Sequence, residues 1–381
     1  MWKKYFYISF FLFINIFLFP LGLNAQKTHQ TFKDTLDNAF DVSYYLKTLH
    51  GFLPLVSPIT EPAVGYGAAG GGLFFISKKN TITDHQFRMP DIAGVFGGYT
   101  ANGTWFTGGG YFGFWKKDHI RYRGVFGYGD IKLKYYGEGD DFLDQHPVTF
   151  RIKSYFLLQQ LVFRLGNSPF FLGGKFQWTK NTVVLFDHTE IPGIDPVDLN
   201  ATNSGIGFIA EYENYNNLFS PSEGIRINFT WDQYLRFLGS DKDFGKITFF
   251  ALYYFSVLSN RWISGFRVES QWATGDAPFY MKPFVHLRGI PAMRYQNNLT
   301  TLIETEQEIT ITRRWSVVAF GGYGKAFASY KTFPEGINAW NVGTGFRYLI
   351  ARLFGMKMGL DIARGPEQWA VYVVVGNAWI R

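Results

Sequence analysis

The sequence predicts an all-β fold, a transmembrane antiparallel β-barrel of about 16 strands with a long loop folded into its lumen. Glu304, Glu306 and Glu308 alternate with less polar residues, so a strand here would carry three carboxylates on one face. Residues Arg226 to Arg236 alternate polar side chains with Ile, Phe, Trp and Leu. Such alternation is typical of strands with water on one side and lipid on the other. A long stretch rich in Gly, Pro and Asn carries Arg288 just before the acidic run, which predicts a loop whose arginine reaches those carboxylates.

Composition supports a membrane barrel and narrows the classes of function. Aromatic residues make up 20% of the 381 residues, and charged residues only 18%, below the roughly 25% usual in soluble domains. Aromatic girdles at the two membrane interfaces would account for this excess. The chain has no Cys, which removes disulfide frameworks and thiol metal sites and suits an oxidising periplasm. The formal charge of +7 is scattered along the chain, so we expect no nucleic-acid partner.

The chain divides into three expected regions. Residues 1–25 combine two lysines, a long apolar run and a small-residue ending at Ala25, which predicts a signal peptide for export. Residues 26–60 are too few to bury a core, so we expect a short periplasmic leader that ends in irregular, Pro-punctuated chain. Residues 61–381 form the predicted barrel. After the signal peptide no window reaches the roughly 20 apolar residues of a membrane-spanning helix.

Short runs of aromatic and β-branched residues recur along the predicted barrel, with Gly, Asn, Asp and Pro between them. Arg261 to Trp272 and Asn341 to Ile350 repeat the alternation of the run at 226–236. The other candidate strands are 63–77, 91–101, 104–116, 120–136, 149–165, 170–180, 204–214, 246–258, 300–312, 315–327, 355–363 and 368–380. Single-chain bacterial barrels have even strand numbers, so we expect one further strand in an irregular segment such as Asn181 to Asn203.

Several separated segments resemble one family in order and spacing. Asn214 to Arg226 is an Asn-rich turn with a Pro-x-x-Gly pattern, and Leu287 to Ile290 is similar to a Val-Arg-Gly-Phe/Tyr loop tip. Phe320 to Gly324, Val342 to Arg347 and Met358 to Ala363 follow in the expected order. Together they resemble the BamA/TamA-type superfamily of outer-membrane assembly and secretion barrels, the bacterial surface antigen family. The resemblance covers about the last 170 residues.

Two departures from the family pattern shape the expectations. Family members usually carry periplasmic POTRA domains before the barrel, whereas residues 26–60 leave room only for a short leader, so the chain resembles the short, POTRA-less members. Gly322 stands where the family often has the aspartate that pairs with the loop arginine. The resemblance implies that Arg288 and Gly289, at the loop tip, hold the loop inside the lumen; we call this arrangement the loop lock.

The candidate luminal partners of Arg288 are Glu304, Glu306, Glu308 and Asp361. A buried arginine would make charge-assisted, bidentate bonds to such carboxylates and hold the loop inside the pore. The alternative is a solvated loop arginine beside a generic polar wall, in which the acidic residues line an ion-selective channel or serve no specific role.

No catalytic, cofactor or metal site is expected. The densest acidic group, Asp140, Asp141 and Asp144 with His146, lacks metal-ligand spacing on a defined strand and is interpreted as a solvated loop. Ser220 to Gly224 reads as a turn without a nucleophile elbow. The chain is therefore expected not to be an enzyme.

Three functions remain open, in decreasing order of support. The first is a non-enzymatic factor of outer-membrane biogenesis, whose seam between the first and last strands, near 63–77 and 368–380, perturbs lipid or templates a client strand. The second is a passive pore for small solutes or ions, and an outer-membrane hydrolase has the weakest support. The expected location is a Gram-negative outer membrane, with lipid and other assembly proteins as partners. Trp379 would supply the aromatic signal near the C-terminus.

Overall fold

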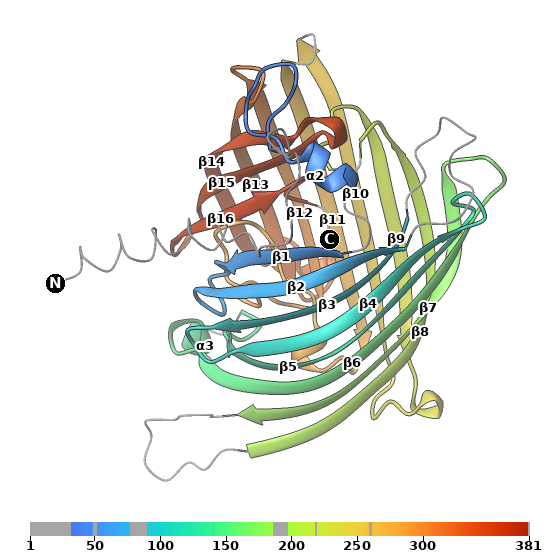
Figure 1. Cartoon of the computed structure of the whole chain (residues 1–381). Helices are drawn as coiled ribbons and strands as arrows, with labels where there is room; N and C mark the ends of the chain where they lie inside the picture. Colours follow the sequence, from blue (N-terminus) through green and yellow to red (C-terminus); the bar gives the residue numbers. More distant parts are fainter. Residues whose placement is uncertain are drawn as a thin grey trace.

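The computed structural model describes residues 32–48, 52–76, 90–139, 141–185, 197–217, 219–258 and 261–379, so the predicted signal peptide at 1–25 lies outside the described residues. These residues form a 16-stranded sheet in which every strand pairs with its neighbours in chain order (Figure 1). The sheet curls into a nearly closed antiparallel β-barrel. The predicted fold class and strand number are therefore confirmed.

The strands are β1 (Phe52–Ile59), β2 (Gly67–Ile76), β3 (Asp91–Thr100), β4 (Trp105–Trp115), β5 (Ile120–Tyr135), β6 (Val148–Arg164), β7 (Phe170–Leu185), β8 (Val197–Tyr215), β9 (Gly224–Tyr234), β10 (Phe244–Leu258), β11 (Trp262–Gly275), β12 (Leu299–Thr310), β13 (Trp315–Phe327), β14 (Ile337–Ala351), β15 (Met356–Arg364) and β16 (Trp369–Val375). The described helices are α2 (Ser43–Thr48), α3 (Asp141–Gln145) and the short 3-10 turns η1 (Arg236–Leu238), η2 (Phe279–Met281), η3 (Tyr330–Thr332) and η4 (Arg352–Phe354). None of these helices has the length and apolar character needed to span a membrane.

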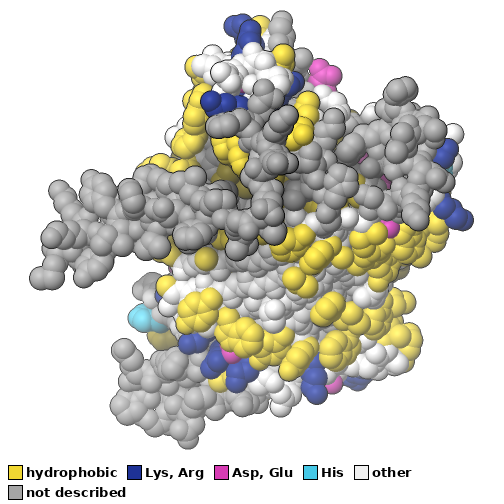
Figure 2. Space-filling view, in the orientation of Figure 1, with side chains coloured by type: hydrophobic (Ala, Val, Ile, Leu, Met, Phe, Trp, Pro, Cys, Tyr) yellow, Lys and Arg dark blue, Asp and Glu magenta, His cyan; other side chains and the backbone are white. Residues whose placement is uncertain are grey.

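On the strands, apolar side chains are exposed and polar side chains are buried, the reverse of the pattern in a soluble protein. On β9, Trp231 is 51% exposed, whereas the adjacent Asp232 is only 4% exposed. Neighbouring strand residues point to opposite faces, so the apolar face is outside and the polar face is inside. Figure 2 shows apolar side chains gathered across the outer face of the front strands, with charged side chains toward its edge. This arrangement suits a barrel that has lipid outside.

The first strand corrects the predicted boundaries. Phe52–Ile59, expected as irregular leader, is β1 and pairs in full register with β2, so the barrel begins before the predicted position 61. Pro54 and Pro58 argued against a strand here, because proline has no backbone N–H to donate to a β-ladder. β1 is an edge strand, and an edge tolerates proline. The sixteenth strand is therefore β1 and does not lie within 181–203, which holds the end of β7 and the start of β8.

The barrel has a seam where its first and last strands meet. No ladder joins β1 to β16 among the described residues, although each is paired along its other side. The seam thus runs along Phe52–Ile59, where the sequence had suggested 63–77. It leaves backbone groups of two strand edges without a ladder partner.

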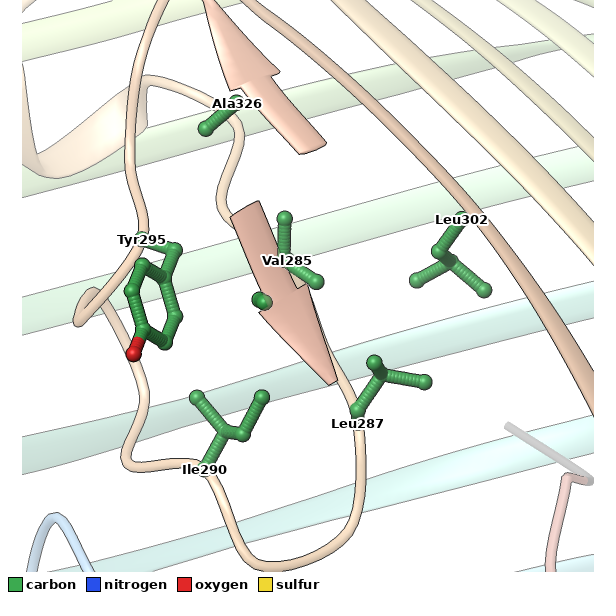
Figure 3. Packing of buried hydrophobic residues seen from close by; sticks show 7 residues of the cluster. Val285, Leu287, Ile290, Tyr295, Leu302 and Ala326 are labelled. Atoms are coloured by element: carbon green, nitrogen blue, oxygen red, sulfur yellow. The ribbon is translucent and has the colours of Figure 1, made fainter. Parts of the chain in front are cut away.

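The segment between β11 and β12, residues 276–298, carries much of the buried apolar core. Val285, Leu287, Ile290 and Tyr295 pack with side chains of β12, β13 and β14 (Figure 3). At another place, Phe279 packs its ring 5.1 Å from that of Phe150 on β6. The segment therefore contacts strands on widely separated parts of the sheet.

Candidate functional site

The tip of the 276–298 segment is shaped by a glycine. Gly289 has a φ of 88°, a left-handed conformation that glycine adopts without strain. Its N–H donates to the hydroxyl of Tyr372 on β16 at 2.8 Å. A Cβ at this position would lie 2.8 Å from the nitrogen of Gly365, so the tip fits tightly against the turn between β15 and β16. The conformation of Gly289 sets the position of the preceding residue, Arg288.

Arg288 lies among three of its four predicted carboxylate partners. Its Nη1 is 2.7 Å from both Glu306 Oε2 and Asp361 Oδ2, and its Nη2 is 3.1 Å from Glu304 Oε1. The Cζ atom stands 3.4 Å from the centroid of the Phe320 ring, which adds a cation–π contact. The planar guanidinium offers five N–H donors in a fixed fork, whereas a lysine ammonium offers three from a single nitrogen.

Two further arginines balance the charges of this group, which we call the Arg288 cluster. Arg347 on β14 donates to Asp361 Oδ1 at 2.5 Å and to Oδ2 at 3.1 Å. Arg267 on β11 has its Nη2 3.5 Å from Glu304 Oε2. The Arg288 cluster thus contains three guanidinium groups (Arg267, Arg288, Arg347) and three carboxylates (Glu304, Glu306, Asp361). Mutual pairing is what makes so many buried charges tolerable.

Glu308, the fourth predicted partner, does not reach Arg288. Its Oε1 accepts a hydrogen bond from Lys357 Nζ at 2.5 Å. Glu308 lies two residues beyond Glu306 on the same face of β12, roughly 6 to 7 Å further along the strand. The prediction that Glu308 shares a strand face with Glu306 was right. The position of a residue along a strand, however, does not show whether a loop arginine can reach it.

An aspartate at position 322, which the resemblance suggested, would crowd two neighbouring side chains. A Cβ there would lie 2.8 Å from Leu287 Cδ2 and 2.8 Å from Asn341 Oδ1. Asn341 on β14 donates instead to Glu304 Oε1 at 3.2 Å and to the carbonyl of Arg288 at 3.1 Å. The side-chain amide of Asn341 therefore supports the loop tip from β14, a contact that the sequence did not predict.

Trp379 is a second residue whose place in the site the sequence did not reveal. Its side chain is 2% exposed, and its Nε1 donates to Glu304 Oε2 at 2.7 Å. Gly265 on β11 makes room for the indole, since a Cβ there would lie 2.9 Å from Trp379 Cζ3. Glu304, which is 1% exposed, thus contacts both the loop tip and the end of the chain.

Other loops also hold the segment. Lys282 Nζ is 2.6 Å from both carboxylate oxygens of Glu138, and Arg294 Nε is 3.0 Å from Glu367 Oε1. Arg294 also pairs with Asp144, which lies within α3, in the acidic stretch interpreted as a solvated loop. Asp144 therefore has a specific partner, although it stays partly exposed. Across the described part of the chain, no three acidic or histidine side chains converge as metal ligands.

Acidic residues before β1 form a second charged cluster. Arg314, in the turn after β12, donates through Nε to Asp37 at 2.6 Å, through Nη1 to Asp41 at 2.6 Å, and through Nη2 to Asp34. Arg352 of η4 also donates to Asp34, with its Nε 2.5 Å from the carboxylate. The sequence showed these aspartates only as part of a polar leader, because their partners lie some 280 residues away.

Ion pairing lowers the pKa values in this second cluster. The hydrogen bonds from Arg352 lower the pKa of Asp34 from its ordinary 3.8 to about 2. The hydrogen bonds from Arg314 likewise lower the pKa of Asp37. A carboxylate with a lowered pKa stabilises the docked state fully above its ordinary pKa, and that contribution disappears as the pH falls through the lowered value.

Acid is therefore expected to release residues 32–48 from the barrel between about pH 4 and pH 2. A nitroxide on a cysteine at the exposed Leu36 should give a sharper spectrum, with faster motion, across that range. The same label at the exposed Phe237 in η1 serves as the control, because η1 follows β9 and lies at the rim opposite to the one that holds residues 32–48. Equal mobility of the Leu36 label at pH 7 and pH 2 would contradict the expectation.

The fold and the site together define a class of protein. A barrel of 16 antiparallel strands with apolar residues outside, paired charges inside and an arginine-tipped segment between β11 and β12 is an outer-membrane type of β-barrel. Residues 150–285 match the Omp85 superfamily domain. The predicted resemblance to barrels of this superfamily is thus confirmed.

Solved structures with a similar fold agree with this class. BamA from Haemophilus ducreyi lacking POTRA domains 1–3 matches with a TM-score of 0.60 and 12% identity, over 86% of this chain and 70% of that chain. CdiB from Acinetobacter baumannii matches with a TM-score of 0.55 and 10% identity, over 85% of this chain and 59% of that chain. CdiB from Escherichia coli gives 0.56 and 12%, over 86% and 62%. No curated protein sequence matches the chain.

Proposed function

We propose that this chain is a non-enzymatic outer-membrane β-barrel of Gram-negative type that acts in outer-membrane biogenesis, by inserting, translocating or scaffolding proteins. The observation that carries the proposal is the seam. In an otherwise continuous sheet of 16 strands, β1 and β16 share no ladder among the described residues. Two strand edges without ladder partners can accept a strand from another chain.

The segment 276–298 closes the lumen in this proposal. Phe279 reaches β6, and Arg288 bonds to β12 and β15, which are far from β6 around the barrel. Contacts of one segment with such distant strands support a path across the interior. The Arg288 cluster then acts as a loop lock. If the lumen is closed, client proteins would be handled at the seam and in the surrounding lipid.

The crossing segment also makes the passive pore the weaker candidate function. A lumen crossed by a paired segment disfavours a pore that is always open. The partners expected from the proposal are outer-membrane lipid and other assembly proteins, and it requires no cofactor.

Liposome insertion tests the proposal. Liposomes that contain the protein should fold a urea-unfolded eight-stranded barrel several-fold faster than empty liposomes. Because the chain has no Cys, pairs of cysteines scanned along β1 and β16 can close the seam with a unique disulfide. Oxidation should abolish the acceleration, and reduction should restore it.

The matched control places the disulfide between Ile303 and Tyr323, which are direct partners on the paired strands β12 and β13. This variant should accelerate folding whether oxidised or reduced. Equal acceleration with the β1–β16 seam open and closed, or no acceleration by the unmodified protein, would overturn the proposal.

A further inference from the structure

Residues 32–48 form a docked segment that we call the strap. It precedes β1 in the chain, but its polar contacts are with the turn after β12 and with η4, the turn between β14 and β15. In Figure 1 the strap, in dark blue with α2, lies beside the orange and red strands of the C-terminal part. The segment is therefore held by parts of the barrel that are remote in sequence.

Arg314 is the centre of the docking. Its Nε and Nη2 form a bidentate pair with Asp37 at 2.6 and 2.8 Å, and its Nη1 is 2.6 Å from Asp41. Asp34 completes the set of acceptors, and the Arg314 side chain is only 6% exposed. A bidentate, largely buried pair has defined geometry, unlike a pair of solvated surface charges.

Backbone bonds fix the register of the strap as well. Val42 N donates to Ile350 O at 2.8 Å, and Leu353 N donates to Ser43 Oγ at 3.0 Å. Arg352 N donates to Asp41 Oδ2 at 3.0 Å. Such bonds require one specific alignment of the strap on the turns, so the contact is a built interface within the chain.

The strap connects the two sides of the seam. Its helix α2 ends at Thr48, and β1, on one side of the seam, begins at Phe52. The turns that hold the strap belong to strands β12 to β15, which lie beyond β16 on the other side. We propose that the strap braces the seam, so that the Asp–Arg contacts limit the separation of β1 from β16.

The strap and the loop lock act at opposite ends of the barrel. In an antiparallel sheet the connection after β11 and the connection after β12 lie at opposite ends, so Arg288 and Arg314 hold different rims. The strap would therefore control the seam where the chain enters the barrel. The brace is a property of the barrel itself and does not depend on the proposed role in biogenesis.

The test replaces three carboxylates by isosteric amides, in a variant with Asp34→Asn, Asp37→Asn and Asp41→Asn. A nitroxide at Leu36 reports release of the strap, because that side chain is exposed in the docked state. Two nitroxides, on cysteines at Val56 of β1 and Val375 of β16, report the width of the seam. Both of these side chains are more than half exposed, so labels should not disturb packing.

The triple variant is expected to increase the rate of motion of the Leu36 label on the order of tenfold, and to shift the Val56–Val375 distance distribution to longer and broader values. In a control pair of labels at Ile303 on β12 and Val342 on β14, the distance should stay unchanged, because β13 lies between these strands and is paired with both. The matched charge control, Glu223→Gln with Asp276→Asn and Glu335→Gln, also removes three carboxylates, all of them exposed, and should leave both readings as in the unmodified protein.

Two results would overturn the inference. If the strap is released and the Val56–Val375 distances stay as they were, the strap does not brace the seam. If the Leu36 label stays immobile in the triple variant, the carboxylates do not hold the strap.

Discussion

Arg288→Ala is expected to turn a quiet barrel into a leaky one. The substitution removes the guanidinium that contacts Glu304, Glu306 and Asp361, and leaves the three carboxylates to repel one another. Removing one partner from a buried ion pair costs about 3 to 5 kcal/mol, which would lower the population of the docked loop by about two to four orders of magnitude. Single-channel recordings in planar bilayers should show frequent openings that the unmodified protein lacks.

Two further variants make this measurement specific. Arg236→Ala removes a charge from an arginine whose side chain is 67% exposed, and should leave the bilayer quiet. Arg288→Lys keeps the charge but loses the fork, so intermediate leakage is expected. Large, steady currents through the unmodified protein that Arg288→Ala leaves unchanged would remove the loop lock and favour the passive pore.

Glu304→Gln is expected to destabilise the barrel by about 3 kcal/mol, the cost of leaving buried arginines without their charged partner. Glu304 accepts bonds from Arg288, Asn341 and Trp379. The amide keeps the shape of the side chain, so the loss would reflect charge and not a cavity. Guanidinium unfolding in detergent micelles, followed by tryptophan fluorescence, measures the change in the free energy of unfolding.

The control for this variant is Asp243→Asn, which makes the same chemical change in an exposed pair. Arg236 and Asp243 lie 3.8 Å apart and are 67% and 54% exposed, so the change should stay below about 1 kcal/mol. A loss of stability in Glu304→Gln no larger than in the control would show that Glu304 is a generic wall residue.

Tertiary contacts decided which carboxylates meet Arg288. Their common face could be predicted, because side-chain alternation along β12 is a local property of the strand. Asp361 joins them from β15, and Glu308 instead pairs with Lys357. Which of these lies within reach depends on the position of the loop tip, and that position is set by contacts such as Gly289 with Tyr372.

The two ends of the described chain show the same limit. Trp379 was expected as an insertion signal, which stays a prediction, and its indole also contacts Glu304 beside the loop tip, a contact that the sequence did not predict. The aspartates before β1 were expected within a short periplasmic leader, and their partner Arg314 could not be predicted. No local pattern marks such pairings, because the partners become neighbours only after the sheet has curled and brought its first and last strands together.

The sequence alone determined the class of fold, the number of strands and the acidic face, because alternation, turn residues and composition act over a few residues. It misplaced β1, since two prolines hide an edge strand whose tolerance for them depends on the seam beside it. The tertiary structure alone decided the seam, the partners of Arg288 and the docking of the strap. These features join residues up to 318 positions apart, and such contacts arise from the closure of the barrel.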